Sequence, residues 1–543
     1  MTRPAQPAPP RAGAIPAKAA GPWPSRLALA AIVVASALIR LRIAALPLER
    51  DEGEYAYFGQ LILRGEWPYV AAYNMKLPGI YYTYAAILAL LGQTDVAIRV
   101  ALLLVNAATI VLVAALARRF VGAAAALTAA AAYAVLSLGT SVVGFTANAE
   151  HFVLLPALAG LLLLQDGRDS TARLLGAGLL LGIGVVMKQP GAFFVACGAA
   201  WIAVSGAAPV RVVRALALFG IAAALPYALT CLAMLAGGAF EPFWFWTVVY
   251  LREYGTMLNL TVGLPELYGQ LGRMLTASPL TWLLAAAGVA SLATRQLERR
   301  SRLQIVALVA TSAATVVPGL RFTDHYFLLV LPALSVLAAL GADGILLRLG
   351  ASRGAAAARI AAAVLPLLIF VLGVAHDRAT LLVRAPAENA RAVYGVNPLA
   401  ESIEIAQEIA RRAAPDDQIA VIGSEPQIYF YARRRAATGF VYMYPLMEPQ
   451  PFARQMQRDM IAQLERARPR FLVLVNVDMS WSRRPDSSLE ILDWAARTVD
   501  ADYRQIGLVE IPPDAPSRSV WGDGAPSAAP HTKSFVAIFE RRT

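Results

Sequence analysis

Cysteine and charged side chains are scarce in this sequence, and each shortage excludes a class of protein. Only two of its 543 residues are cysteine, Cys197 and Cys231, and both lie in apolar runs. They support neither a disulfide framework nor a thiolate metal site. Charged residues make up 15% of the chain and hydrophobic residues 58%, with a mean hydropathy of +0.55. A soluble protein with so many apolar runs would aggregate, so the sequence predicts a polytopic membrane protein.

Lysine is also scarce, and the excess of positive charge is almost entirely arginine. The net charge of +12 does not predict nucleic-acid binding, because the arginines gather in short tracts between hydrophobic runs, where they set topology and meet anionic membrane lipid. Only four of the 48 basic side chains are lysine, and two of these, Lys76 and Lys188, fall in predicted outer loops. In such a chain we expect lysine where a compact ammonium is needed, for example beside a phosphate.

About eleven apolar segments are predicted to span the membrane. A further segment, 79–92, is not counted, because thirteen helical residues reach only about 20 Å against a hydrocarbon core of roughly 30 Å. With that choice the arginine tracts of five alternate loops fall on the cytoplasmic side, as the positive-inside rule requires. The predicted spans are 27–46, 96–117, 122–142, 150–165, 172–188, 190–207, 212–235, 278–294, 303–319, 326–347 and 359–376.

An odd number of spans places the two termini on opposite sides of the inner (plasma) membrane. The Pro- and Ala-rich residues 1–25 are then a disordered cytoplasmic tail, and residues 26–376 form the membrane domain, with a first outer loop at 47–95. Residues 377–398 are a linker, and residues 399–543 are predicted to form a soluble extracytoplasmic α/β domain.

The last domain shows alternating helical and strand patterns. No Gly-rich nucleotide motif, P-loop or zinc spacing occurs in it, so we expect it to shape acceptor access or docking and not to carry chemistry. Its likeliest ligand contact is Gly423 to Pro426, and residues 512–531 are predicted to be a mobile loop. The predicted elements are helices at 399–413, 425–432 and 449–467, a helix opened by a capping box from Ser487 to Glu490, and strands at 418–423, 437–441, 470–477, 503–510 and 534–540.

The first outer loop is the most charged part of the membrane region. It begins with acids at Asp51, Glu52 and Glu54 directly after an apolar helix. If 51–63 is helical, Asp51 shares one face with Tyr55 and other apolar residues, which predicts a helix lying on the bilayer surface.

Four segments together resemble a known family. They are DEGEYAY at 51–57, KLPGIYY at 76–82, KQPG at 188–191 and RFTDHYFLLVLPAL at 321–334. In combination they resemble the GT-C glycosyltransferases of the family 39 type, which include protein mannosyltransferases and the lipid A aminoarabinose transferases. The resemblance covers roughly residues 27–376. It implies a polyprenyl-phosphate-linked sugar as donor and a lipid, polysaccharide or protein acceptor on the extracytoplasmic side.

Glycosyl transfer with inversion needs a carboxylate that accepts the proton of the incoming hydroxyl and cations that stabilise the departing phosphate. Asp51 fits the base and is the acid that matches the family's first-loop motif, with Glu52 orienting the acceptor or the base. No cofactor is required. A divalent metal is doubtful, because Met75 stands where some relatives carry a carboxylate. The phosphate candidates are Lys76, Lys188, Arg321, His325 and Arg40, and the accessory candidates are Glu54, Tyr55, Glu150 and Tyr326.

Each candidate also has a structural interpretation. Asp51 and Glu52 fit the first turn of a helix, Lys76 and Lys188 fit snorkelling interface residues, and His325 fits an interfacial histidine. Glu150 fits a solvated loop. The aromatic residues between 240 and 254 fit either an interfacial belt or a clamp for a polyprenyl tail.

The main alternative function is a polytopic transporter or lipid flippase, and a second is a non-catalytic surface receptor. Transporters usually carry ionisable residues at the bilayer midplane and show repeated halves. In this sequence the charges lie in outer loops and no internal repeat is detected.

Overall fold

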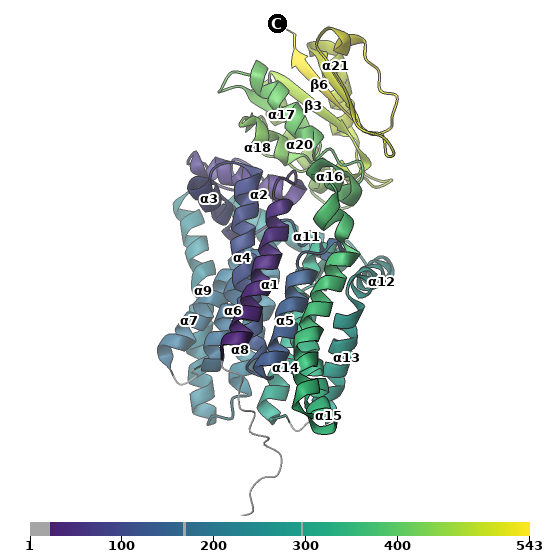
Figure 1. The fold of residues 1–543 in the computed structure, drawn as a ribbon. Helices are drawn as coiled ribbons and strands as arrows, with labels where there is room; N and C mark the ends of the chain where they lie inside the picture. The colour runs from purple at the N-terminus through teal and green to yellow at the C-terminus, as the bar shows by residue number, and fades with distance from the viewer. Residues whose placement is uncertain (1–21, 167–169, 295–296, 543) are drawn as a thin grey trace, which may run out of the picture.

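A bundle of long apolar helices carries a small mixed sheet at one end (Figure 1). The computed structural model describes residues 22–166, 170–294 and 297–542. The predicted tail at 1–25 lies outside the described residues except for its last four, which already belong to α1. The bundle helices are α1 (Pro22–Arg42), α4 (Asp95–Ala117), α5 (Ala123–Leu136), α6 (Ala149–Asp166), α7 (Thr171–Met187), α8 (Ala192–Ala203), α9 (Pro209–Ala236), α12 (Leu260–Ala277), α13 (Pro279–Thr294), α14 (Arg299–Ala314) and α15 (Leu331–His376).

The helices coincide with the apolar segments, but the count of eleven spans is not established. By length and composition, three described helical stretches could cross a membrane alone: α4, α9 and Asp324–His376. A fourth is the pair α12 and α13, which is bent by 105°. Predicted spans 326–347 and 359–376 belong to one assigned helix, α15, which breaks at Gly354, where φ is 85°. Residues with a side chain rarely adopt a φ of that sign, so the glycine permits the break in the helix.

Small residues let the bundle helices approach closely. A Cβ built on Gly288 of α13 would lie 2.0 Å from the carbonyl oxygen of Leu337 in α15. A Cβ on Gly341 of α15 would in turn lie 2.0 Å from the carbonyl oxygen of Leu284. The two glycines therefore face each other's helix, as small residues do where membrane helices pack backbone to backbone.

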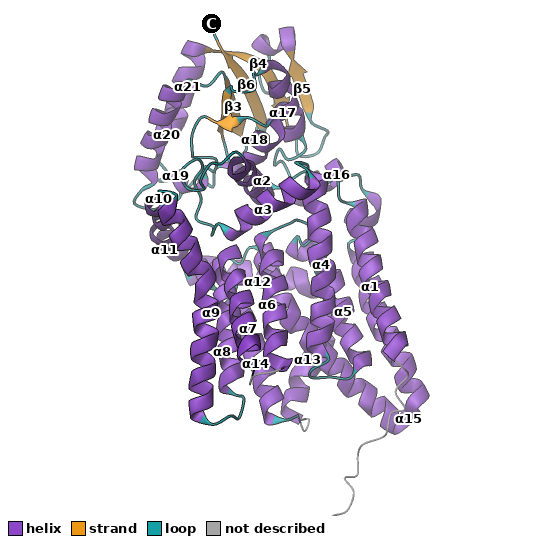
Figure 2. Cartoon of the chain, turned by 90° about the vertical axis from the view of Figure 1, so that its left-hand side faces the viewer, coloured by secondary structure: helices purple, strands orange, loops and turns teal. Residues whose placement is uncertain are grey.

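Two short helices, α2 (Arg50–Leu63) and α3 (Gly79–Leu91), lie between the bundle and the sheet (Figure 2). Glu49 caps α2: its carboxylate accepts the backbone N–H groups of Asp51 and Glu52, and the Glu52 side chain accepts that of Glu49. The 13 residues of α3 make it one of the shorter apolar helices, as the sequence predicts.

The prediction that α2 lies on the bilayer surface is wrong. Tyr55 and Phe58 are fully buried, because α2 packs between α3 and α18 of the C-terminal domain. Gly53 permits this contact, since a Cβ there would lie 2.6 Å from the Cβ of Gln427. A single cluster of buried apolar side chains runs from α2 and α3 into the C-terminal sheet.

The C-terminal sheet has strand order β2-β1-β3-β6-β4-β5. β1 pairs in parallel with β2 and β3, whereas β6 is antiparallel to β3 and β4, and β4 is antiparallel to β5. α18 connects β1 to β2, and α19 and α20 connect β2 to β3. Because β2 and β3 lie on opposite sides of β1 and connections between parallel strands are nearly always right-handed, we expect α18 and α20 on opposite faces of the sheet. The strands are β1 (Gln418–Ile422), β2 (Arg435–Ala436), β3 (Phe471–Asn476), β4 (Tyr503–Glu510), β5 (Arg518–Trp521) and β6 (Phe535–Arg541), and the helices are α16 (Pro386–Tyr394), α17 (Glu401–Arg412), α18 (Pro426–Ala432), α19 (Tyr444–Met447), α20 (Ala453–Ala467) and α21 (Glu490–Asp502).

Three local predictions in this domain are wrong. The short strand expected at 437–441 is β2, two residues long and earlier in the chain. Ser487 does not cap α21, because its hydroxyl donates to the carbonyl of Met447. The expected mobile loop 512–531 contains β5, which pairs with β4.

The linker is also more ordered than its composition suggests. Residues Ala379–Val383 and α16 are helical, and Arg42 of α1 donates to the carbonyl oxygen of Val383 at 3.0 Å.

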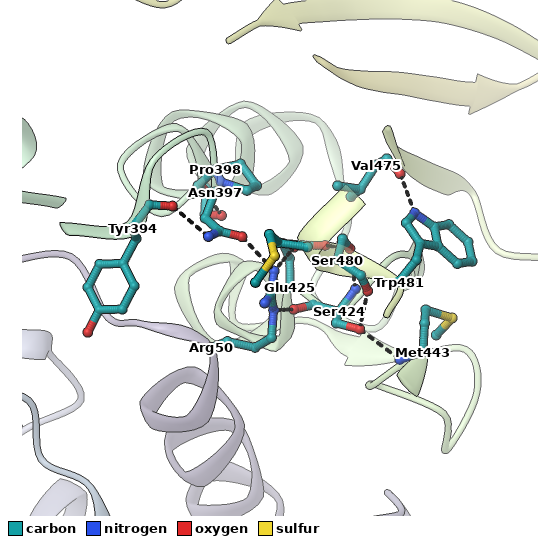
Figure 3. Close-up of polar contacts among 12 residues, drawn as sticks. Arg50, Tyr394, Asn397, Pro398, Ser424, Glu425, Met443, Val475, Ser480 and Trp481 are labelled. Carbon is teal, nitrogen blue, oxygen red and sulfur yellow. Dashed lines mark hydrogen bonds and ion pairs between the residues drawn. The ribbon is translucent and has the colours of Figure 1, made fainter. Parts of the chain in front are cut away.

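Arg50, whose side chain is 11% exposed, joins the C-terminal domain to α2 (Figure 3). The Nε of Arg50 donates to the carbonyl oxygen of Ser424 at 2.5 Å, and its Nη2 donates to Oε1 of Glu425 at 2.9 Å. Glu425 is fully buried and also accepts from Ser480 at 2.8 Å. The segment from Gly423 to Pro426, predicted as a ligand contact, therefore binds a side chain of the same chain.

Candidate active site

A cavity of about 610 Å³ lies where the outer loops of the bundle meet the C-terminal domain. Its lining comes from α2, from the loop before α3, from the adjoining ends of α6 and α7, from the turns before α15, and from the domain segment around α19. Its ionisable and aromatic lining residues include Glu49, Arg50, Asp51, Lys76, Glu150, Lys188, Tyr250, Tyr254, Arg321, Asp324, His325, Tyr326, Tyr442, Tyr444 and Glu448.

Asp51 is the most heavily contacted acid in this cavity. Its Oδ1 lies 3.0 Å from the Nζ of Lys76 and accepts a hydrogen bond from the hydroxyl of Tyr442 at 2.9 Å. Its Oδ2 lies 3.9 Å from Nε2 of His325. The two oxygens therefore differ: Lys76 and Tyr442 donate to Oδ1, whereas among the described residues the imidazole of His325 is the cationic group recorded near Oδ2.

Burial and the neighbouring charges act on Asp51 in opposite directions. Burial by itself would raise the pKa of Asp51, but Lys76, His325 and Lys188 outweigh it and hold that pKa well below its usual range. Burial would likewise lower the pKa of Lys76, but Asp51 and Glu54 raise it. This pair is therefore charged throughout the physiological range.

Glu49 has the opposite balance. Burial and the adjacent charge of Asp51 raise the pKa of Glu49 to about 7. An acid that titrates near neutrality thus stands two residues before the candidate base, at the N-cap of α2.

Lys188 forms an ion pair with Glu150, and its Nζ lies 4.2 Å from the centre of the Tyr326 ring. Glu150 is fully buried, so the solvated-loop interpretation of this residue is wrong. Lys76 and Lys188 are 9% and 8% exposed and both are ion-paired, which excludes snorkelling for either side chain.

Arg321 is held by the C-terminal domain. Its Nη2 donates to Oε1 of Glu448 at 2.8 Å, and its Cζ lies 3.8 Å from the centre of the Tyr254 ring. The other oxygen of Glu448 accepts from the hydroxyl of Tyr250 at 2.8 Å. Next in the chain, the Nδ1 of His325 lies 3.3 Å from Oδ1 of Asp324.

Four predicted site residues do not line the cavity. Glu52 is fully buried, pairs with Arg99 and accepts the backbone N–H of Ala147 at 2.5 Å. Arg40 donates to the carbonyl oxygens of Ser137 and Gly144. Glu54 and Tyr55 lie behind Lys76: Glu54 Oε2 is 2.8 Å from its Nζ, and the centre of the Tyr55 ring is 4.7 Å from it. These positions favour structural roles for Glu52 and Arg40 and a supporting role for the other two.

The residues that sequence reasoning missed are Glu49, Tyr442 and Glu448. Glu49 was visible as one of several adjacent acids, but nothing marked it as the cap that faces the cavity. Tyr442 and Glu448 come from the C-terminal domain, where no motif signalled contact with the helix bundle. No local pattern predicts this, because the contact depends on how the domain docks on α2.

The aromatic segment at 240–254 spans α10 (Phe240–Trp244), a π-helical turn and α11 (Leu251–Thr256). It is mostly buried against the first outer loop and the domain: Trp246 stacks on Tyr73 with ring centres 5.7 Å apart, and Phe245 meets Phe452 edge-on at 5.1 Å. Trp244 is exposed, and Tyr250 and Tyr254 line the cavity, so the belt and the clamp both stay predictions for this segment.

No group of three or more His, Cys, Asp or Glu side chains among the described residues is arranged to hold a metal ion.

Comparison with known proteins identifies the fold. Residues 75–234 match the family model described as dolichyl-phosphate-mannose-protein mannosyltransferase. The whole structure superposes on ArnT from Cupriavidus metallidurans bound to undecaprenyl phosphate, with a TM-score of 0.59 and 17% identity, over 95% of this chain and 97% of ArnT. This chain has the GT-C fold.

A second GT-C structure agrees with this assignment. The archaeal oligosaccharyltransferase AglB from Archaeoglobus fulgidus, in complex with an inhibitory peptide and a dolichol-phosphate, matches with a TM-score of 0.53 and 13% identity. That match covers 92% of this chain and 75% of AglB. No curated protein matches the sequence. The resemblance noted in the four sequence segments is thus confirmed at the level of the GT-C fold.

Proposed function

We propose that this protein is an integral membrane glycosyltransferase that moves a sugar from a polyprenyl-phosphate donor to an acceptor hydroxyl on the extracytoplasmic side. The observation that carries the proposal is the cavity in which Asp51 meets Lys76 and shares a lining with Lys188 and Arg321. The two solved relatives support the donor class, since one is bound to undecaprenyl phosphate and the other to a dolichol-phosphate.

In this mechanism the acceptor oxygen bonds to the anomeric carbon as the bond from that carbon to the phosphate oxygen breaks. The acceptor proton passes to Asp51, and the electron pair of the broken bond leaves with the polyprenyl phosphate. Lys76, Lys188 and Arg321 stabilise the negative charge that develops on the phosphate. A phosphate is already a good leaving group, so the step needs no general acid.

The low pKa of Asp51 fits this mechanism. Lys76 is the main charge that lowers it. When a phosphate binds, the ammonium of Lys76 is shared with a second anion, so the proton affinity of Asp51 rises with the donor in place. The base is therefore strongest in the complex that reacts.

The transporter or flippase alternative is less well supported. The buried charges converge at one end of the bundle, against the soluble domain, and each cation is ion-paired there. A transport site is instead expected at the bilayer midplane.

The proposal is tested by deleting the gene and restoring it as wild type, as Asp51→Asn or as Glu66→Gln. Glu66 is an acid of the same loop that lies outside the cavity and pairs with Arg435 at 2.8 Å. We expect the deletion to remove one envelope glycan and to accumulate its lipid-linked donor, as measured by mass spectrometry. Wild type and Glu66→Gln should restore the glycan, and Asp51→Asn should not, at equal protein levels in the membrane. Unchanged glycans in the deletion strain, or restoration by Asp51→Asn, would contradict the proposal.

A further inference from the structure

The C-terminal domain reaches the cavity with one short segment, residues 442–448. The hydroxyl of Tyr442, at its start, donates to Oδ1 of Asp51 at 2.9 Å. Glu448, at its end, accepts from Arg321 at 2.8 Å. The segment thus contacts both the candidate base and a candidate phosphate cation, although it belongs to the soluble domain.

Tyr442 is itself held firmly in place. It is 9% exposed, and its ring meets that of Tyr444 edge-on with centres 5.0 Å apart. The backbone N–H of Met443 donates to the hydroxyl of Ser424 at 2.8 Å. The carbonyl oxygen of Ser424 accepts from Arg50, the residue before Asp51. Ser424 therefore connects the contact that docks the domain on α2 to Met443, the residue next to Tyr442.

The contacts divide the two oxygens of Asp51. Among the described residues, the donors within 3.5 Å of the carboxylate, Lys76 and Tyr442, both lie on Oδ1. Oδ2 lies 3.9 Å from the imidazole of His325, beyond hydrogen-bond distance. Lys76 is shared with Glu54 at 2.8 Å, so it alone does not fix the orientation of the Asp51 carboxylate.

We propose that Tyr442 is a positioning residue of the transfer reaction, which holds Oδ1 of Asp51 so that Oδ2 receives the acceptor proton. This inference rests on the proposed function. It makes the site composite: the base comes from the membrane domain and its orientation comes from the C-terminal domain.

Removing the phenol should also change how Asp51 titrates. A donor to the ionised carboxylate favours that form, so its loss moves the acid limb of the kcat profile, which reports the donor complex, to higher pH. The other charged groups that face Asp51 remain in such a variant: Glu49, Arg50 and Glu54 from α2, Lys76 from the following loop, Glu150 and Lys188 from the ends of α6 and α7, and His325 from the turn before α15.

The test uses the full chain in lipid nanodiscs, with the polyprenyl-phosphate sugar extracted from the deletion strain as donor. The variants are Tyr442→Phe, Asp51→Asn and the control Tyr503→Phe. Tyr503 is a buried residue of the same domain whose hydroxyl donates to the carbonyl of Pro469 at 2.6 Å, outside the cavity. We expect Tyr442→Phe to lower kcat about tenfold or more, to leave KM for the donor within about twofold, and to shift the acid limb upward. Tyr503→Phe should change neither kcat nor the pH profile.

Wild-type kcat and an unshifted pH profile in Tyr442→Phe would overturn the positioning role. So would a loss of activity without a shift of the acid limb, because a purely structural defect gives that result. In either case inactivity of Asp51→Asn would leave the proposed function standing. Activity of Asp51→Asn would instead overturn the proposed function itself.

Discussion

The positive charges of the candidate site are balanced by carboxylates of the same chain. Lys76 pairs with Asp51 and Glu54, Lys188 with Glu150, and Arg321 with Glu448. Paired in this way, cations can remain buried without an anionic ligand. A donor phosphate would then join existing pairs, so its binding depends on the shape of each cation as well as on its charge.

Lys76→Arg is expected to lower sugar transfer by at least about tenfold, although it keeps the charge. The ammonium of Lys76 fits between two carboxylates and above the Tyr55 ring, where a planar guanidinium has no equivalent position. The control is Lys533→Arg, which changes an exposed lysine of the C-terminal domain. Equal transfer rates for both variants in the nanodisc assay would contradict a requirement for a compact cation.

Glu49→Gln is expected to flatten the pH dependence of both donor binding and stability near neutrality. The folded pKa of about 7 lies above the usual value of about 4.3 for glutamate. The stability that comes from neutral Glu49 is therefore complete below about pH 4.3 and is lost as the pH rises through 7. Above pH 7 the ionised carboxylate also repels the donor phosphate.

Between about pH 4.3 and pH 8 wild type should therefore show a fall in Tm that is complete soon above pH 7, and a rise in KM for the donor centred near pH 7. Glu49→Gln should show smaller changes, because His325, whose pKa is also raised, still titrates in the variant. The measurements are thermal unfolding and donor KM across that range, and parallel wild-type and variant curves would count against the raised pKa.

Residue scarcity and the four family-like segments pointed independently to the same two lysines. Two of the four lysines stood in outer loops, and the structure places both of these in the cavity beside acids. Tyr442 and Glu448 could not be found in this way, because tyrosine and glutamate are common in the chain and the contacts join residues that are 391 and 127 positions apart.

At the scale of elements, α2 connects the membrane domain to the C-terminal domain. The sequence indicated an amphipathic helix with an aromatic face, and that pattern fits a bilayer surface as well as a protein surface. The pattern could not distinguish the bilayer surface from the protein surface, because the partner helix α18 lies more than 350 residues further along the chain. The closest approach is at Gly53.

Gly53→Ala is expected to destabilise the protein by about 1–3 kcal/mol, because the new methyl group overpacks the contact with Gln427 of α18. Gly220→Ala is the matched control: Gly220 lies inside α9, and a Cβ there would meet nothing within 4 Å. The control should be neutral or slightly stabilising, since alanine favours helix over glycine. Thermal unfolding in nanodiscs measures both, and equal Tm values would contradict close packing of α2 on α18.

At the scale of the whole molecule, hydropathy was enough to predict a helical membrane bundle followed by an α/β domain. The sequence did not establish the number of spans, because several bundle helices are shorter than the thickness of a hydrocarbon core and α15 joins two predicted segments. Orientation stays a prediction from the positive-inside rule.

Two single-cysteine variants test that orientation in a background with Cys197 and Cys231 replaced by alanine. Asp523→Cys lies on the exposed surface of the C-terminal domain, and Ser352→Cys lies beside the Gly354 break of α15. Figure 1 shows the turn of α15 at the end of the bundle away from the C-terminal domain. A membrane-impermeant maleimide should label the first variant in intact cells and the second only after permeabilisation. The reverse pattern would place the cavity on the cytoplasmic side.

The most direct test of the whole account is a structure of the full chain with undecaprenyl phosphate bound. We expect the phosphate to lie in the cavity within ion-pair distance, about 4 Å, of Lys76, Lys188 or Arg321, with Asp51 facing the side from which an acceptor enters. A phosphate bound elsewhere, remote from these cations or at the opposite end of the bundle, would contradict the account.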